Sequence, residues 1–246
     1  MPLPQIFAHR GAKAVAPENT LPAFAKALEM GVAGIELDVH CGKDDTLVVI
    51  HDASVERTTN GSGAVSDYTA AELAQLDAGS HFDATFANVG VPTLAEVFDL
   101  VEDRCLVNVE VKTFDPTGGN QVEPLIAMIQ ARNLYAQVIV SSFNPMTLIK
   151  LRWLDPKVRL GLLYYLPMTS WLANAWFTPI MQPEAVHPHS SLIDEQHVTW
   201  ARNQNCAVNT WTVNDIDEAK RLAGLGIDAI MSDVPDQIMA ALVQSK

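Results

Sequence analysis

The chain alternates short apolar, β-branched segments with longer segments of helical periodicity, and this alternation constrains its fold more than any other feature. Strands that alternate with helices pair in parallel, and eight such units suggest a closed barrel. The sequence therefore predicts an α/β protein with a single (β/α)8 TIM barrel. Strands are predicted at residues 6–8, 34–39, 106–111, 138–142, 158–163, 185–187, 207–212 and 228–232. Helices are predicted at residues 21–31, 94–101, 122–132, 145–153, 194–203, 215–225 and 235–243.

The length fits one barrel domain with a small insertion. The 246 residues are close to the roughly 250 that such a barrel typically takes, and the 48% of hydrophobic residues supply a large core. We therefore expect residues 1–246 to form one catalytic domain. Residues 53–91 are far longer than an ordinary connection of about 2 to 6 residues. We predict that they form an insertion after the second strand, placed over the site.

The charge of the chain excludes some classes of partner. A net charge of −13 and an isoelectric point near 4.8 argue against nucleic acid or an anionic membrane surface, because both require a basic face. A small-molecule substrate is expected instead. If that substrate is a phosphate ester, the site needs local positive charge, for which Arg10, Lys112 and a bound divalent cation are the candidates.

Cysteine usage and hydropathy predict a cytoplasmic protein. The three cysteines are far apart and form no Cys-x-x-Cys pair, which indicates reduced thiols. The N-terminal residues show no export signal. Residues 160–183 lack any charge, but Pro167, Asn174 and Pro179 interrupt them, so stable membrane insertion is not expected. The aromatic residues of this segment could line the mouth of the pocket or a contact in a homo-oligomer.

Residues 34–52 concentrate the chemistry of the chain. Glu36 and Asp38 alternate with apolar residues, which places both carboxylates on one face of a strand, about 6 to 7 Å apart. The apolar run 47–50 reads as a returning strand that delivers His51 beside this acidic pair. Two interpretations remain open at this point: a solvated strand face, and a metal site with a proton carrier next to it.

Other polar residues also follow predicted strands. His9 and Arg10 follow the first strand, and Glu110 and Lys112 lie at the end of the third. The carboxyl ends of barrel strands form the face on which active sites are found, so these side chains are expected to converge there with Ser142. The carboxylates of Glu36, Asp38 and Glu110 are hard oxygen ligands, and they predict one divalent cation, either Mg²⁺ or Ca²⁺.

Short motifs along nearly the whole chain together resemble the glycerophosphodiester phosphodiesterase family, of the bacterial cytoplasmic type. The resemblance is specific because so many motifs occur in one order. They are HRG at 9–11, PENT at 17–20, ELDV at 36–39, HD at 51–52, RTTNGSG at 57–63, EVK at 110–112, SSFNP at 141–145, NTWTVN at 209–214 and GIDAIMSDVP at 226–235.

This resemblance implies an enzyme of lipid and glycerol metabolism that hydrolyses glycerophosphodiesters to sn-glycerol 3-phosphate and an alcohol. His9 and His51 are expected to divide acid and base catalysis. Arg10 and Lys112 would bind the phosphate, and Phe143 and Trp211 would flank the glycerol carbons. Attack by the neighbouring glycerol hydroxyl, through a cyclic phosphate, and direct attack by water both remain open. The preferred headgroup alcohol is open too.

Two rival functions fit part of the pattern. A metal-dependent sugar-phosphate isomerase or aldolase would use the carboxylates and Lys112, but it leaves both histidines without a role. A non-catalytic barrel that binds a phosphate ligand would need none of the acid and base groups. The remaining histidines are expected to be structural or on the surface; they are His40, His81, His187, His189 and His197.

Overall fold

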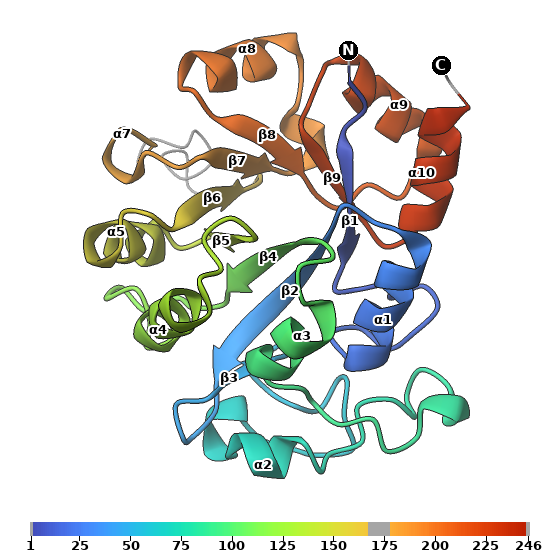
Figure 1. Cartoon of the computed structure of the whole chain (residues 1–246), viewed down its shortest axis with the longest axis vertical. Coiled ribbons are helices and arrows are strands. Elements are labelled where there is room, and N and C mark those ends of the chain that lie inside the picture. Colours follow the sequence, from blue (N-terminus) through green and yellow to red (C-terminus); the bar gives the residue numbers. More distant parts are fainter. Residues whose placement is uncertain (1, 167–177, 245–246) are drawn as a thin grey trace.

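A computed structural model of the chain describes residues 2–166 and 178–244. Within these residues, eight parallel strands close into a barrel surrounded by helices (Figure 1), which confirms the predicted fold. Pairing between β1 and β2 closes the barrel. The strands of the barrel are β1 Gln5–His9, β2 Gly34–Cys41, β4 Leu106–Val111, β5 Val138–Ser142, β6 Arg159–Tyr164, β7 Ala185–Pro188, β8 Ala207–Thr210 and β9 Ala229–Ser232.

The helices begin where local capping residues allow. Thr93 and Glu96 form a reciprocal capping box at the start of α3, which satisfies backbone N–H groups that the helix leaves unpaired. Asp194 and Asp215 cap α8 and α9 through their carboxylates, so both helices begin one residue later than predicted. The helices are α1 Leu21–Met30, α3 Leu94–Val101, α4 Val122–Arg132, α5 Pro145–Leu154, α7 Thr178–Met181, α8 Glu195–Asn203, α9 Ile216–Gly224 and α10 Pro235–Val243.

The apolar segment between β6 and α7 is only partly described. Trp171, Trp176 and Phe177 lie outside the described residues, so the prediction that they line the pocket mouth or an oligomer contact stays a prediction. In the described part of the chain, no helix has both the length and the apolarity that crossing a membrane requires.

The main hydrophobic core lies between the strands and the surrounding helices. Ile35, Leu37 and Val39 of β2 are fully buried in it, as are Val107 and Val109 of β4. Since side chains alternate across a strand, the residues between them face the inside of the barrel. Parallel register keeps Glu36 beside Asn108 and Asp38 beside Glu110 on that inner side. The apolar alternation thus fixes which side chains line the interior.

The barrel interior next to these carboxylates is polar as well. Ser141 pairs in register with Glu110 and with Gly161. A Cβ on Gly161 would lie 2.6 Å from Nε2 of His187, so this glycine leaves room for the imidazole. Asn209 donates from Nδ2 to Nε2 of His187 over 3.0 Å, whereas Nδ1 of His187 has no hydrogen-bond partner among the described residues. The expectation that His187 is structural agrees with this buried position.

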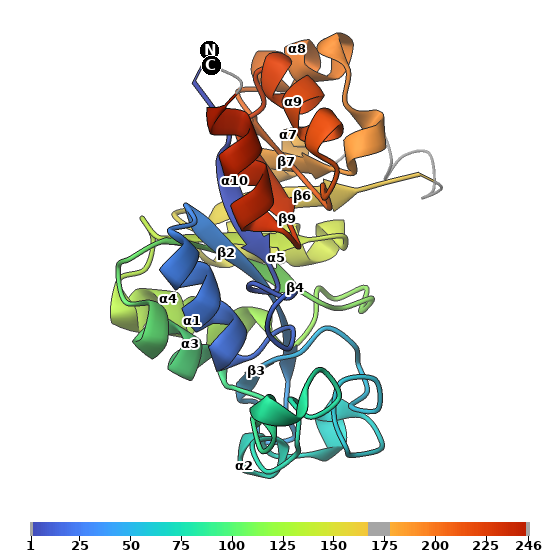
Figure 2. The ribbon, with the colours of Figure 1, turned by 90° about the vertical axis from the view of Figure 1, so that its right-hand side faces the viewer.

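The insertion leaves the barrel from an extension of β2. Residues 39–41 at the end of β2 pair antiparallel with β3 Leu47–Val49, the predicted returning strand, and His40 and Cys41 extend past the pairing with β4. The following residues contain η1 Val65–Asp67, α2 Ala70–Leu73 and η2 Ala84–Phe86 and project to one side of the barrel (Figure 2). They pack around a separate apolar cluster of Val48, Ile50, Val55, Val65, Ala70, Leu73, Ala78 and Val91.

The buried histidine predicts a specific dependence of stability on pH. Burial lowers the pKa of His187 to about 3, against 6.5 for an ordinary histidine. Below about pH 6.5 the unfolded chain binds a proton that the folded protein does not, so His187 destabilises the fold as the pH falls towards 3. At about pH 5 this penalty is roughly 2 kcal/mol. When the pH is lowered from about 7.5 to about 5, the free energy of unfolding of His187→Leu should therefore rise by roughly 2 kcal/mol relative to that of wild type.

Urea unfolding at both pH values measures this difference. His81→Leu, at an exposed position in the insertion, is the matched control for the loss of an imidazole. Parallel pH dependence in wild type and His187→Leu would contradict the prediction.

Candidate active site

Three buried carboxylates form the centre of the site. Glu36 and Asp38 lie on β2 and Glu110 lies on β4, where Asp38 and Glu110 are register partners. Oxygen atoms of all three lie within 4.8 Å of one another. Glu36 is 2% exposed and Asp38 is 1% exposed, so the interpretation of this face as a solvated strand surface is wrong.

The charge of this cluster is only partly balanced by the protein. Burial, together with repulsion from the neighbouring carboxylates, raises the pKa of Glu36 well above its ordinary value and that of Glu110 to about 7. Burial also opposes ionisation of Asp38, but Lys112 and Arg10 lower its pKa. A divalent cation fits this arrangement, because hard carboxylate oxygens are the ligands that Mg²⁺ and Ca²⁺ prefer.

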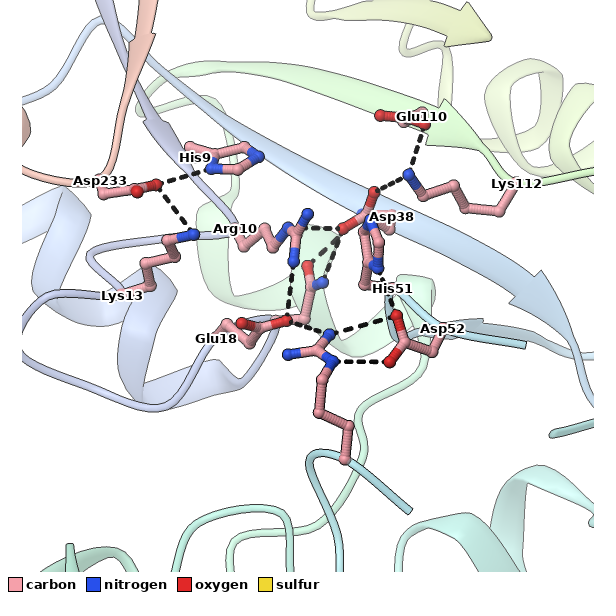
Figure 3. Close-up of polar contacts among 12 residues, drawn as sticks. His9, Arg10, Lys13, Glu18, Asp38, His51, Asp52, Glu110, Lys112 and Asp233 are labelled. Atoms are coloured by element: carbon pink, nitrogen blue, oxygen red, sulfur yellow. Dashed lines mark hydrogen bonds and ion pairs between the residues drawn. The ribbon is translucent and has the colours of Figure 1, made fainter. Parts of the chain in front are cut away.

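Two basic side chains lie among these acids (Figure 3). Nζ of Lys112 is 2.6 Å from Glu110 and 3.2 Å from Asp38. Nε of Arg10 is 3.3 Å from Asp38, and NH1 donates to Glu18 over 3.0 Å. The backbone N–H of Arg10 donates to Glu36 over 3.1 Å from a left-handed conformation, φ 57°. Such strained backbone is found at functional sites, where the surrounding structure maintains it.

Asn19 supports the acidic cluster and was not predicted as a site residue. Its Nδ2 donates to Asp38 over 2.8 Å, and its Oδ1 accepts from the backbone N–H of Asp38 at 3.4 Å. Asn19 also has a left-handed backbone, φ 56°, which asparagine tolerates better than most residues. The PENT motif contains this residue, but only the fold shows that it reaches β2.

Each of the two predicted catalytic histidines is held by an aspartate. Nδ1 of His9 is 2.6 Å from Asp233, and Nδ1 of His51 is 2.5 Å from Asp52. In each pair Nδ1 is occupied by the aspartate, which leaves Nε2 for a substrate. Burial lowers the pKa of both histidines, while the hydrogen bonds that they donate to Asp233 and Asp52 act in the opposite direction.

Asp233 has further polar contacts that hold it in place. Lys13 lies 3.1 Å from it, and Asn214 donates to it over 2.8 Å. Although burial opposes ionisation, the hydrogen bond to His9 lowers the pKa of Asp233, with help from Asn214 and Lys13. Asp233 directly follows β9, so its place after a strand was the sequence signal that could have identified it.

A cavity of about 120 Å³ opens at the carboxyl ends of these strands. Phe143 and Trp211 form part of its wall, with an edge-to-face contact between ring centroids 5.3 Å apart. In the described part of the chain, residues 53–91 contribute no lining residue to this cavity, and their predicted place over the site stays a prediction. The lining residues are His9, Arg10, Glu36, His51, Asn108, Glu110, Lys112, Phe143, Leu163, Trp211, Thr212 and Met231.

The structure brings the predicted site residues into one region. Eight of the nine line the cavity, and the ninth, Asp38, is buried against Lys112 and Arg10. Asn108 was not predicted; its buried Oδ1 has no hydrogen-bond partner among residues 2–166 and 178–244. His40 and His189 lie next to the site, His40 against the backbone carbonyl of His51 at 3.1 Å and His189 against the ring of Trp211.

Comparison with known proteins agrees with this arrangement. A model of the glycerophosphoryl diester phosphodiesterase family matches residues 9–237. A glycerophosphodiester phosphodiesterase from Caldanaerobacter subterraneus is 39% identical over 236 residues, 95% of this chain and 96% of the relative. A phosphodiesterase from Oleispira antarctica, solved in complex with the product sn-glycerol-3-phosphate, has a TM-score of 0.86 at 30% identity and covers 98% of this chain and 97% of its own. A glycerophosphodiester phosphodiesterase from Agrobacterium tumefaciens has a TM-score of 0.83 at 27% identity, with coverages of 97% and 100%.

The contacts of Asn19 predict an unusual order of stability among variants. Asn19→Gly keeps the left-handed backbone but removes both bonds to Asp38, which should lower the free energy of unfolding by about 1 to 3 kcal/mol. Asn19→Ala should cost about 1 kcal/mol more, because a Cβ disfavours that backbone.

Urea unfolding of both variants measures these costs. Asn88 is the matched control, since it is exposed and also left-handed, φ 64°. Asn88→Gly should leave the free energy of unfolding nearly unchanged, and only Asn88→Ala should lower it. Equal, small costs for Asn19→Gly and Asn88→Gly would show that Asn19 contributes nothing through Asp38.

Proposed function

The chain belongs to the glycerophosphoryl diester phosphodiesterase family, and we propose that its buried carboxylates and two histidine–aspartate pairs form the active site of that enzyme. It hydrolyses glycerophosphodiesters to sn-glycerol 3-phosphate and an alcohol. One observation supports the placement of the active site above all others: His9, His51, Arg10 and Lys112 line the same cavity as Glu36 and Glu110.

We propose that Glu36, Asp38 and Glu110 hold one divalent cation, Mg²⁺ or Ca²⁺. The raised pKa of Glu36 supports this, because burial and two neighbouring acids leave it with more negative surroundings than the protein itself balances. When bound, such a cation polarises a phosphodiester oxygen and stabilises developing negative charge. With the cation bound, Lys112 and Arg10 would be available to interact with the phosphate as well as with the carboxylates.

The phosphate and the glycerol would occupy different parts of the cavity. The Arg10 guanidinium can donate two parallel hydrogen bonds to a phosphate, while the Lys112 ammonium acts as a point charge. Phe143 and Trp211 offer an apolar wall that suits the glycerol carbons. The phosphodiesterase from Oleispira antarctica, bound to sn-glycerol-3-phosphate, supports a small-molecule substrate of this chemistry.

Proton transfer is assigned to His9 and His51. With Nδ1 of each occupied by an aspartate, Nε2 of one histidine can remove a proton from the nucleophile, and Nε2 of the other can protonate the leaving alkoxide. The lowered pKa of each histidine keeps a neutral form available near pH 7, as a general base requires. The aspartates stabilise the imidazolium that forms during turnover.

The environment of Lys112 argues against the aldolase alternative. Although burial opposes its charge, Asp38 and Glu110 raise the pKa of Lys112 above its ordinary value. An amine that forms covalent intermediates needs a lowered pKa. We also assign the enzyme to the cytoplasm, because all three cysteines are free and buried. Its assignment to lipid and glycerol metabolism rests on the glycerophosphodiester substrate of the family.

An assay of sn-glycerol 3-phosphate release from glycerophosphocholine tests this function. Wild type should be active with Mg²⁺ or Ca²⁺ and inactive with a chelator. Glu36→Gln should lower metal-dependent turnover by at least about 10²-fold, because it removes one hard, charged ligand. Glu123→Gln, at the surface near Lys150, is the matched control. Full turnover by Glu36→Gln in the presence of a chelator would refute the metal assignment.

The two histidines predict the pH profile of turnover. The rate should rise with pH as the base becomes neutral and fall as the acid loses its proton, which gives a bell-shaped curve. Burial lowers both pKa values, so both limbs should lie lower in pH than for exposed histidines. His9→Ala and His51→Ala should each lower kcat by about 10²- to 10⁴-fold and remove one limb. A variant that keeps the wild-type profile would exclude that histidine from proton transfer.

A further inference from the structure

We propose that Arg57, a residue of the insertion, is a positioning residue that holds the Asp52–His51 pair in its catalytic orientation. The proposal rests on the assignment of His51 as a proton carrier. Arg57 does not line the cavity, and its side chain is 46% exposed, so it acts through other residues.

Arg57 holds Asp52 with two nitrogen atoms. Its Nε donates to one carboxylate oxygen of Asp52 over 2.6 Å, and its NH2 donates to the other over 3.3 Å. The second oxygen is the one that contacts Nδ1 of His51 at 2.5 Å. A fork of this kind fixes the plane of the carboxylate as well as its position. The orientation of the His51 ring therefore depends on the guanidinium of Arg57.

Arg57 also contacts the other side of the site. Its NH2 donates to Glu18 over 2.8 Å, and Glu18 accepts a second bond from Arg10. One guanidinium thus connects the loop after β1 with the residue that follows His51. A lysine cannot reproduce these contacts, because its single nitrogen lacks the planar fork.

The charge of Arg57 keeps Asp52 in the form that the pair requires. Hydrogen bonding from Arg57 is the main cause that lowers the pKa of Asp52 to about 2. An ionised Asp52 accepts the Nδ1 proton of His51 and thereby selects the tautomer with a free Nε2. Without Arg57 the carboxylate could turn towards solvent, since Asp52 is about one-third exposed.

The insertion is built so that Arg57 stays in place. Val55 is fully buried in the apolar cluster of the insertion. Its backbone N–H donates to Gly63, and its carbonyl accepts from both the N–H and the hydroxyl of Thr59. Ser54 pairs with Ala64 across the same loop. Arg57 therefore extends from an anchored turn, which gives the insertion a role in a site whose cavity it does not line.

The test compares Arg57→Met, Arg57→Lys, Arg57→Ala and wild type in the glycerophosphocholine assay with saturating divalent cation. We expect Arg57→Met to lower kcat by about 10- to 100-fold, the usual effect of losing a group that orients a functional residue. KM should change little, because Arg57 lies outside the cavity. Arg57→Lys should recover only part of kcat, and added guanidinium at millimolar concentration should partly restore Arg57→Ala.

A double-mutant cycle separates positioning from general stability. In a His51→Ala background, Arg57→Met should change kcat/KM by less than about twofold, because the residue through which it acts is gone. Exposed ion pairs contribute little to stability, so the urea unfolding midpoint of Arg57→Met should stay near that of wild type. Arg132→Met removes a comparable surface pair with Asp99 and is the matched control, with unchanged kcat.

Three results would overturn the proposal. They are full kcat in Arg57→Met, an equal loss in the wild-type and His51→Ala backgrounds, and no recovery of a folded Arg57→Ala variant by added guanidinium. Inactive wild type would instead refute the proposed function. The two failures are therefore distinguishable.

Discussion

The burial of three carboxylates within 4.8 Å of one another is the constraint on which the rest of the structure depends. Such a cluster is costly unless opposite charges or a cation compensate it. Lys112 and Arg10 supply part of the compensation, and Asn19 adds hydrogen bonds to Asp38. The neighbouring turns are shaped to deliver these groups, including two left-handed residues after β1. The remaining negative charge is what makes the site suitable for a divalent cation.

The two histidines reach this cluster from different directions. His9 lies at the end of β1 and is held by Asp233 from the loop after β9, its neighbour in the barrel. His51 lies beyond the barrel, after β3, and is held by the adjacent Asp52. The first pair is thus fixed by the pairing of β1 with β9. The second lacks that support, and the insertion compensates through Arg57.

The barrel separates stability from chemistry by the alternation of its strands. Outward residues such as Ile35 and Val109 form the apolar core under the helices, while inward residues such as Glu36 and Asn108 form a polar interior. Because the core does not depend on the interior, the site can carry unpaired polar atoms and raised pKa values. The buried imidazole of His187, for which Gly161 leaves room, shows that this polar character continues around the barrel interior.

The sequence by itself determined the barrel and the shared face of Glu36 and Asp38, because both follow from local periodicity. The reaction and the roles of His9 and His51 were implied by the motifs that the chain shares with a known family. The alternation of strands and helices fixed the fold, and the spacing of Glu36 and Asp38 placed them on one face. Tertiary structure alone decided that this face is buried, that Asp233 meets His9 across 224 positions, and that Asn19 and Arg57 reach the site. Periodicity specifies which way a side chain points along its own strand. Contacts between distant segments depend on how the barrel closes and where the insertion packs, and no local pattern encodes that.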